Sequence, residues 1–277
     1  MQPKPSAAKS RSRLLGALAS AAACFALVAC GGSAKSPGGQ DPERMSEAEY
    51  DVARDLWLRQ GKSREALSHA LSAVELDEHN AEAAHLVALI YLGFCQRSTD
   101  ECRLSAAESH ARQALDSDPQ FREARNTLAV VLIHQKRYAD AIAVLKTLTA
   151  DILYQTPENA WGNLGWAYLE HGKTDQAIDA LRRSIAAQPL FCVGNYRLGL
   201  AYERKRDLNA ALSSLTRALE TDDPRCRSLQ DAYAARARVL MKVGRADDAR
   251  ADLTRCQELD QKTHSGKECR SMLRNLK

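Results

Sequence analysis

Asn159–Phe191 reads NAWGNLGWAYLEHGKTDQAIDALRRSIAAQPLF, and the stretch that follows, Cys192–Arg225, reads CVGNYRLGLAYERKRDLNAALSSLTRALETDDPR. The second stretch repeats the pattern of the first at a spacing of 34 residues. A fixed period of this length is typical of stacked-repeat proteins, because each unit can bury its apolar face only against its neighbours. The matched residues are Leu164 and Gly165 with Leu198 and Gly199, Tyr168 with Tyr202, Ala177 with Ala211, and Leu181 with Leu215.

The period and the pattern W-x2-L-G-x2-Y resemble the tetratricopeptide repeat (TPR). Apolar residues recur at helical spacing within each unit, for example Ile178, Leu181 and Ile185. We therefore predict an all-α fold: a right-handed superhelical solenoid of about six TPR helix hairpins plus a C-terminal capping helix, with about thirteen helices. Such a solenoid is a binding surface without built-in chemistry.

The same register, extended in both directions, places six units between residues 47 and 263. Residues 264–277 remain and predict a helix that caps the apolar face of the last unit. Three units are longer than 34 residues, with the extra residues inside Gly93–Ser105, near Tyr154–Thr156 and near Arg227–Gln230. Insertions in solenoids collect in turns. The unit bounds are 47–80, 81–121, 122–157, 158–191, 192–229 and 230–263.

Residues 1–29 have the layout of a secretory signal peptide, with a basic start, an apolar run and a small residue before the cut. The run ends Leu27-Val28-Ala29-Cys30-Gly31, which resembles the bacterial lipobox and predicts a lipid on Cys30. The alternative is an ordinary signal peptide cleaved nearby, with Cys30 a plain thiol. Residues 30–46, rich in Gly, Pro and Ser, predict a flexible tether behind a permanent lipid anchor.

Gly31 follows the proposed lipid site, in place of the Asp that retains enterobacterial lipoproteins at the inner membrane. We therefore expect a lipid-anchored protein at the outer membrane that faces the periplasm. The formal charge of +4 comes from the signal segment, where Lys4, Lys9, Arg11 and Arg13 occur without an acid. The remainder is near neutral and lacks a basic stripe interleaved with aromatics, which argues against nucleic-acid binding.

The chain has eight cysteines, of which Cys24 belongs to the signal peptide and Cys30 is the proposed lipid site. An exported protein with six further cysteines favours disulfides, and six cysteines allow 15 pairings. The repeat register favours one of these pairings, since each predicted pair joins ends of antiparallel helices or flanks an insertion. Buried free thiols and a metal site are the alternatives, although no C-x2-C pair supports zinc. The predicted pairs are Cys95–Cys102, Cys192–Cys226 and Cys256–Cys269.

No catalytic, nucleotide-binding or metal-binding motif occurs, so we expect neither an enzyme nor a cofactor nor a metal site. His134 and His171 end the first helices of their units, where a cation suits the helix C-terminus.

The inner, concave face of TPR proteins is lined by fixed positions of each first helix, and these positions are unusually apolar here. Trp57 and Trp161 occupy positions that ordinary core packing explains. Trp166 does not, so it is either buried against the next repeat by tight curvature or an anchor for an apolar or amphipathic partner segment. The predicted partner-binding groove consists of Leu89, Val130, Ile133, Trp166, Leu169, Leu200 and Met241.

A lipobox followed by six TPR units resembles the type IV pilus pilotin lipoproteins, the PilF/PilW group, and most of all its Tgl subgroup. The resemblance depends on the repeat count, the paired cysteines and three segments: Thr156–Ala160 running into Asn163-Leu164-Gly165-Trp166, Pro189-Leu190-Phe191-Cys192 with Gly194, and Cys256 followed by Cys269-Arg270. It implies a monomeric assembly factor that binds secretin subunits and promotes their multimerisation. Two alternatives remain, a TPR lipoprotein of another outer-membrane machine such as barrel assembly, and a scaffold for cell-wall synthases.

Overall fold

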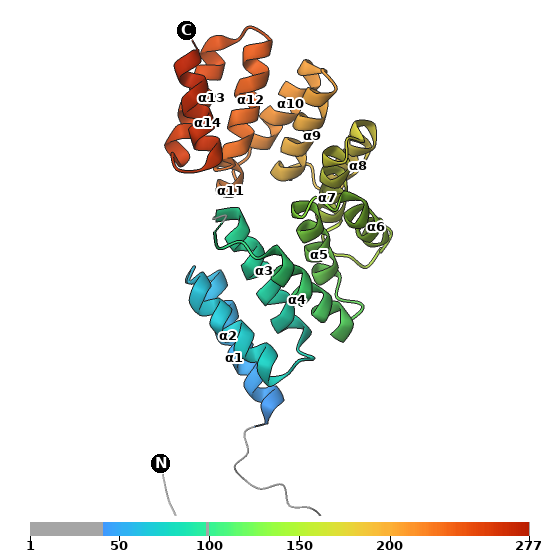
Figure 1. Ribbon diagram of the computed structural model, residues 1–277. Coiled ribbons are helices and arrows are strands. Elements are labelled where there is room, and N and C mark those ends of the chain that lie inside the picture. The colour runs from blue at the N-terminus through green and yellow to red at the C-terminus, as the bar shows by residue number, and fades with distance from the viewer. Residues whose placement is uncertain (1–40, 98–99, 277) are drawn as a thin grey trace, which may run out of the picture. The chain divides into compact units, whose positions relative to one another are not determined.

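The computed structural model describes residues 41–97 and 100–276, in which helices are the only regular secondary structure (Figure 1). The predicted signal peptide, Cys30 and most of the predicted tether lie outside these residues. The described part contains fourteen helices, one more than the repeat pattern suggests. The additional helix is α11 (Pro224–Arg227), a single turn that leads into the insertion predicted near Arg227–Gln230.

The helices form six antiparallel pairs in chain order, which confirms the TPR solenoid. The A helices, the first of each pair, are α1 (Pro42–Leu58), α3 (Ala81–Arg97), α5 (Arg122–His134), α7 (Pro157–Glu170), α9 (Cys192–Arg204) and α12 (Gln230–Lys242). The B helices are α2 (Ser63–Leu76), α4 (Leu104–Ser117), α6 (Tyr138–Thr149), α8 (Thr174–Ala187), α10 (Leu208–Leu219) and α13 (Ala246–Leu259). Apart from the starts of α1 and α7, each helix lies within the unit predicted for it.

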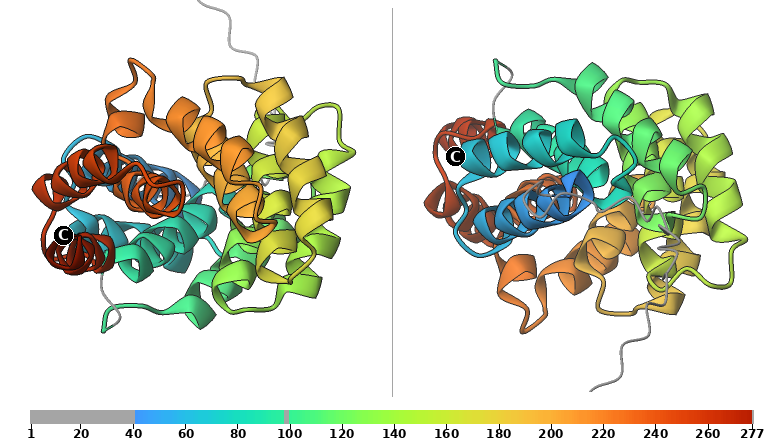
Figure 2. Two further views of the ribbon diagram at one scale, coloured as in Figure 1. Left: turned by 90° about the horizontal axis from the view of Figure 1, so that it is seen from above. Right: turned by 90° about the horizontal axis from the view of Figure 1, so that it is seen from below.

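The A helices form the inner layer of the stack. Each contacts the A helix of the next unit, whereas successive B helices of the described chain make at most slight contact. On the inside of a curved stack the helices are more crowded, so this difference identifies the A helices as the inner face. Figure 2 views the same helices along the vertical axis of Figure 1 and shows the successive pairs turned relative to one another.

The Leu-Gly element of the repeat marks a close approach of the A and B helices. A Cβ on Gly165 would lie 2.4 Å from Leu181 Cγ, and one on Gly199 would lie 2.5 Å from Leu215 Cγ. Both leucines are fully buried. The same contact thus recurs one period later, which is why glycine and leucine repeat together in the sequence.

The turns between A and B helices share a left-handed residue in five units. Glycine supplies it three times, at Gly61, Gly172 and Gly244 with φ of 66°, 78° and 80°. In the third and fifth units Lys136 and Arg206 adopt φ of 63° and 66°, at a cost of about 1 kcal/mol each. The geometry of the helix pair therefore prevails over local preference.

The first helix begins before the predicted boundary of the tether at residue 46. Asp41 caps α1 through a bond from Glu43 N to its Oδ1 (3.3 Å), and Pro42 occupies the first turn, where its missing N–H costs nothing. Ser46, the last residue of the predicted tether, is fully buried and donates its hydroxyl proton to the carbonyl of Ala73 (2.7 Å). This bond ties the start of α1 to α2.

α14 (His264–Asn275) packs against α12 and α13 as the predicted cap. Its N-cap Thr263 accepts a bond from Gly266 N (3.0 Å) and donates to Gln230 Oε1 (2.6 Å). The Gln230 amide in turn donates to the Asp260 carbonyl (2.6 Å). These bonds explain how a largely polar helix closes the stack at the sixth unit.

Candidate functional site

The structure divides the seven predicted groove residues into two sets. Ile133 and Leu169 are 3% and 1% exposed, so they support the inner face from beneath and offer no surface to a partner. The other five are half-buried and reach the surface: Leu89, Val130, Trp166, Leu200 and Met241.

The half-buried residues do not form one continuous patch. Trp166 and Leu200 pack against the same apolar cluster, which also contains Ile133 and Leu169. Val130 packs in a neighbouring cluster with Leu92 and Val131. Met241 lies in a separate cluster near the C-terminal cap. The apolar surface is therefore centred on α7 and α9, in the fourth and fifth units.

Trp166 is held between the A helices on either side of its own. The His134 ring meets it edge-on, with ring centroids 5.2 Å apart, and the Arg197 guanidinium lies over it, 4.5 Å from the ring centroid. The indole nevertheless stays half-buried. The structure therefore packs Trp166 against the neighbouring repeats and leaves it partly exposed, and its role as an anchor for a partner stays a prediction.

A row of polar side chains runs across α5, α7 and α9 beside this tryptophan. Asn163 donates from Nδ2 to Asn126 Oδ1 (2.9 Å), and Arg197 donates from Nη1 to Asn163 Oδ1 (2.8 Å). Asn163 is buried, and Asn126 and Arg197 are half-buried. The row links three units and fixes the guanidinium above the indole.

Burial lowers the pKa values of the two titratable groups that contact Trp166. It lowers the pKa of His134, and the nearby positive charge of Arg197 lowers it further. His134 is therefore neutral near pH 7, which contradicts a role as the cation that complements the end of α5. Burial also lowers the pKa of Arg197 to about 10, so its guanidinium remains charged at neutral pH.

The apolar surface ends at the sixth unit, where charged residues replace it. Glu203 pairs with Arg238 (3.4 Å) and Lys242 (2.7 Å), and Arg238 also reaches Glu268 of α14 (3.4 Å). These ion pairs link α9, α12 and α14, and each charge in them has a partner within the protein. The fourth and fifth units consequently remain the strongest candidate for partner binding.

Sequence reasoning missed the polar row, although a signal was present. Asn163 and Arg197 are 34 residues apart and so occupy the same register position in adjacent units. Polar residues at equivalent positions of successive A helices indicate a ladder across the inner layer. Asn126 is offset by the two-residue insertion of the third unit and by one further position, so the register alone does not reveal its contact with Asn163.

The structure pairs the cysteines as the register predicted. The sulfur atoms of Cys95 and Cys102 are 2.09 Å apart, those of Cys192 and Cys226 are 2.02 Å apart, and those of Cys256 and Cys269 are 2.01 Å apart. The second pair joins the start of α9 to α11, and the third joins α13 to the cap. Oxidation of these cysteines in the cell stays a prediction.

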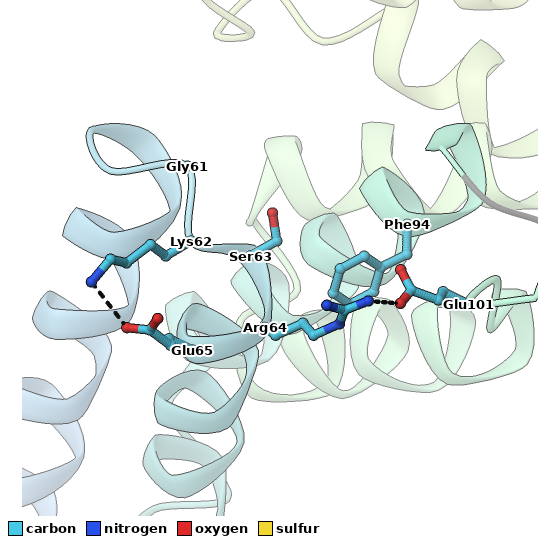
Figure 3. A pocket seen from close by; sticks show the side chains of 7 residues that line it. All are labelled: Gly61, Lys62, Ser63, Arg64, Glu65, Phe94 and Glu101. Atoms are coloured by element: carbon cyan, nitrogen blue, oxygen red, sulfur yellow. Dashed lines mark hydrogen bonds and ion pairs between the residues drawn. The ribbon is translucent and has the colours of Figure 1, made fainter. Parts of the chain in front are cut away.

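A separate pocket of about 490 Å³ lies between the turn of the first unit and the insertion of the second (Figure 3). Its charges are internally paired, Arg64 with Glu101 and Lys62 with Glu65 (3.2 Å). Figure 3 shows the Arg64–Glu101 pair beside the ring of Phe94. Across residues 41–97 and 100–276, no group of three or more His, Cys, Asp or Glu is placed to hold a metal ion.

Family comparisons agree with the fold. Three family models described as tetratricopeptide repeat match residues 100–152, residues 152–190 and 163–225, and residues 230–263. Together they cover more than half of the chain, which therefore belongs to the tetratricopeptide repeat proteins.

Two known proteins illustrate what the sequence is similar to. The chain is 27% identical over 155 residues to the type IV pilus assembly protein PilF of Pseudomonas aeruginosa, covering 53% of this chain and 58% of that protein. It is 28% identical over 182 residues to Superkiller complex protein 3 of Homo sapiens, covering 64% of this chain and only 11% of that protein. Neither alignment spans two thirds of the relative.

Solved structures share the fold over a greater length. PilW, described as a widely conserved type IV pilus biogenesis factor, superposes with a TM-score of 0.65 at 22% identity, covering 80% of this chain and 96% of PilW. PilF of Pseudomonas aeruginosa superposes with a TM-score of 0.61 at 18% identity, covering 84% of this chain and all of that chain. A TPR protein from Parabacteroides merdae reaches 0.68 at 15% identity, covering 83% and 84%. At these identities the likeness establishes the fold alone.

Among the described residues, no helix has both the length and the apolar character needed to cross a bilayer. Cys30 lies outside those residues, so membrane attachment through this residue stays a prediction.

Proposed function

We propose that this protein is a pilotin-like assembly factor of the type IV pilus, which binds secretin subunits and promotes their multimerisation. The observation that carries the proposal is the 27% identity to PilF over 155 residues, since PilF is named for type IV pilus assembly. The fold likeness to PilW over nearly all of that chain is compatible with it. The lipobox pattern adds support that does not depend on the repeats.

In this proposal a lipid on Cys30 fixes the protein to the outer membrane with the solenoid facing the periplasm. The segment between Cys30 and the start of α1 at Pro42 is at most about 40 Å long when extended. The inner face would therefore be confined near the membrane where secretin subunits insert. Confinement of this kind raises the effective concentration of the two partners without any additional contact.

The inner face offers a partner apolar anchorage at Trp166 and Leu200. Both are half-buried, and Ile133 and Leu169 hold them in place from beneath. Pre-positioned side chains lose little conformational entropy on binding, which favours affinity. An apolar or amphipathic segment of an unassembled subunit suits this surface.

The state of the pilus secretin in a deletion strain tests the proposal. We expect heat-stable secretin multimers to disappear while monomer persists, and a Cys30→Ala variant to reproduce much of this loss by releasing the protein from the outer-membrane fraction. Normal multimers and normal pili in the deletion strain would refute the pilus assignment. Loss of an outer-membrane barrel protein or of cell-wall synthase activity instead would favour the alternatives.

Variants of the inner face separate binding from folding. Trp166→Glu and Leu200→Glu are expected to abolish secretin multimers while the protein remains folded by circular dichroism. Leu190→Glu is the matched control, because Leu190 is 61% exposed outside the inner face. If the folded inner-face variants still support multimers, or if Leu190→Glu abolishes multimers to the same extent as they do, the inner face does not bind the subunit.

A further inference from the structure

Two large aliphatic side chains project into solvent from the loop between α6 and α7. Ile152 is 95% exposed and Leu153 is 61% exposed, and the two lie next to each other at the apex of the loop. Single exposed apolar residues are normal on a protein surface, whereas two adjacent ones form a small apolar patch that a partner or a membrane can cover. We call Ile152 and Leu153 the apolar tip.

The loop that carries the apolar tip is held by several contacts. Leu153 N donates to Asp151 Oδ1 (2.9 Å), and Tyr154 N donates to the Asp151 carbonyl (3.2 Å). Arg122 Nε donates to Asp151 Oδ2 (2.7 Å), which ties the loop to the start of α5. The Tyr154 side chain is buried on the other side of the tip. These contacts fix the two aliphatic side chains in an outward position.

The same turn occurs in other loops of the stack with polar residues at its apex. In each case an Asp side chain accepts a bond from the N–H two residues further on, at 2.9 Å for Asp77 and at 2.8 Å for Asp118. The apex pairs of these turns are Glu78-His79 and Pro119-Gln120. The hydrogen bonds of the turn therefore do not require aliphatic residues, so local structure does not explain Ile152 and Leu153.

The apolar tip lies on the edge of the stack at which the predicted membrane tether joins it. Because the helices of each pair are antiparallel, every loop from a B helix to the next A helix lies at the edge where α1 begins. The A helices from α1 to α7 make three steps, and packed helices lie about 8–10 Å apart, so the tip is about 30 Å along this edge from Pro42. A tether from Cys30 to Pro42 reaches at most about 40 Å. One bilayer surface can therefore hold the lipid and also meet the tip.

We propose that the apolar tip inserts into the phospholipid surface of the membrane that holds the lipidated Cys30, so that the solenoid touches the bilayer at a second point. This inference rests on the lipid anchor of the proposed function, and it adds the orientation of the solenoid on the membrane. A protein held by one flexible tether can rotate, whereas a second contact at the α6–α7 loop restricts the direction in which the inner face points.

The chemistry of the tip favours lipid over a protein partner. Binding energy at protein interfaces is concentrated in Trp, Tyr and Arg, whereas Leu is under-represented there. Aliphatic side chains gain free energy in any apolar medium and need no complementary pocket in a bilayer. The charges beside the tip are mixed, because Arg122 pairs with Asp151, and Glu123 and Glu158 are close enough for their charges to act on Tyr154. The contact should therefore depend on apolar burial, so a zwitterionic lipid should suffice.

Hydroxyl-radical labelling of the unmodified, lipidated protein in phosphatidylcholine vesicles tests the inference. Leu58 is the internal control, because it is 70% exposed at the end of α1, on the opposite edge of the stack. We expect Ile152 and Leu153 to be labelled about tenfold more slowly than Leu58, since a side chain within the bilayer surface is shielded from water. Equal labelling rates, after allowance for exposure, would overturn the inference. Protection that disappears when the protein is diluted at constant lipid would also overturn it, because a second copy would then be the cover.

A photoreactive residue identifies what covers the tip. The protein with p-benzoylphenylalanine in place of Leu153, incorporated in the same vesicles and illuminated, should form covalent adducts with phospholipid that mass spectrometry detects. The matched control has p-benzoylphenylalanine in place of Leu58 and should give almost none. Equal lipid adducts at the two positions, or adducts only with protein at position 153, would overturn the inference.

Three measurements separate this inference from the proposed function. The mass of the mature N-terminal peptide reports the lipid on Cys30, radical labelling reports the tip, and the secretin assay reports the pilus role. A lipidated protein with a freely labelled tip would reject this inference and leave the pilus role intact. A protected tip with normal secretin multimers in the deletion strain would do the opposite. A mature chain without lipid would reject both the anchor and this inference.

Discussion

Gly165→Ala places a methyl group where the structure has no room for one. The added Cβ would lie 2.4 Å from Leu181 Cγ, 2.9 Å from Leu181 Cδ2 and 3.2 Å from the carbonyl oxygen of Ala177. Leu181 is fully buried, and the Ala177 oxygen belongs to the backbone of α8. The steric clash can therefore be relieved only if α7 and α8 move apart or Leu181 changes its rotamer.

Two opposing effects determine how much Gly165→Ala changes the free energy of unfolding. Alanine favours a helix interior over glycine by about 1 kcal/mol. Overpacking of a well-packed core costs about 1–3 kcal/mol, and the contact at 2.4 Å is far inside ordinary van der Waals distance. Because the contact is so short, we expect a cost in the upper part of this range, about 2–3 kcal/mol. After the gain in helix propensity, the free energy of unfolding should fall by about 1–2 kcal/mol.

Urea unfolding followed by circular dichroism measures this change. Gly199→Ala provides an internal replicate, because its Cβ would lie 2.5 Å from Leu215 Cγ. In a Leu181→Ala background the penalty of Gly165→Ala should shrink or reverse, since the clashing atoms are gone. An unchanged or higher stability of Gly165→Ala in the unmodified background would refute the reasoning.

Three further predictions concern other parts of the solenoid. Asp252→Asn leaves Arg236 half-buried beside a neutral amide and should lower the free energy of unfolding by about 3 kcal/mol in urea. Replacing both Cys192 and Cys226 with Ala opens a loop of 34 residues and should cost about 3–4 kcal/mol, and peptide mapping of non-reduced exported protein should show the bond. Burial lowers the pKa of His85 from 6.5 to about 4, so the unfolded chain binds this proton first. Stability should therefore fall as the pH drops from 6.5 towards 4, and His85→Gln should reduce that fall.

Each of these predictions has an outcome that contradicts it. Asp248→Asn breaks the exposed pair with Arg245 and should cost less than about 1 kcal/mol, so equal costs at both aspartates would refute the role of burial. Six alkylatable thiols in exported protein would exclude all three disulfides. For His85, a Gln variant with an unaltered pH profile of stability would exclude the buried imidazole as the cause.

The sequence alone determined the repeat, because the residues that contact one another within a helix pair recur at a fixed period. Gly165 and Leu181, and Gly199 and Leu215, repeat together since each pair makes the same contact between helices. The register also placed Cys192 at the start of one helix and Cys226 after the end of its antiparallel partner, and the structure bonds the two there, with Cys226 on the single-turn helix α11. These interhelix contacts and this cysteine pairing join residues within one repeat period, so they can be predicted from the sequence pattern.

Only the tertiary structure decided which inner-face residues are accessible and how their charges interact. Ile133 and Leu169 occupy register positions expected to face a partner, yet the curvature of the stack buries them. Ser46 reads as part of a Ser- and Gly-rich tether until its bond to the Ala73 carbonyl, 27 residues away, is seen. His134 and Arg197 meet at Trp166 from units on either side of it. Burial and pKa depend on the rotation between successive units, which is the sum of many side-chain contacts and has no local signature in the sequence.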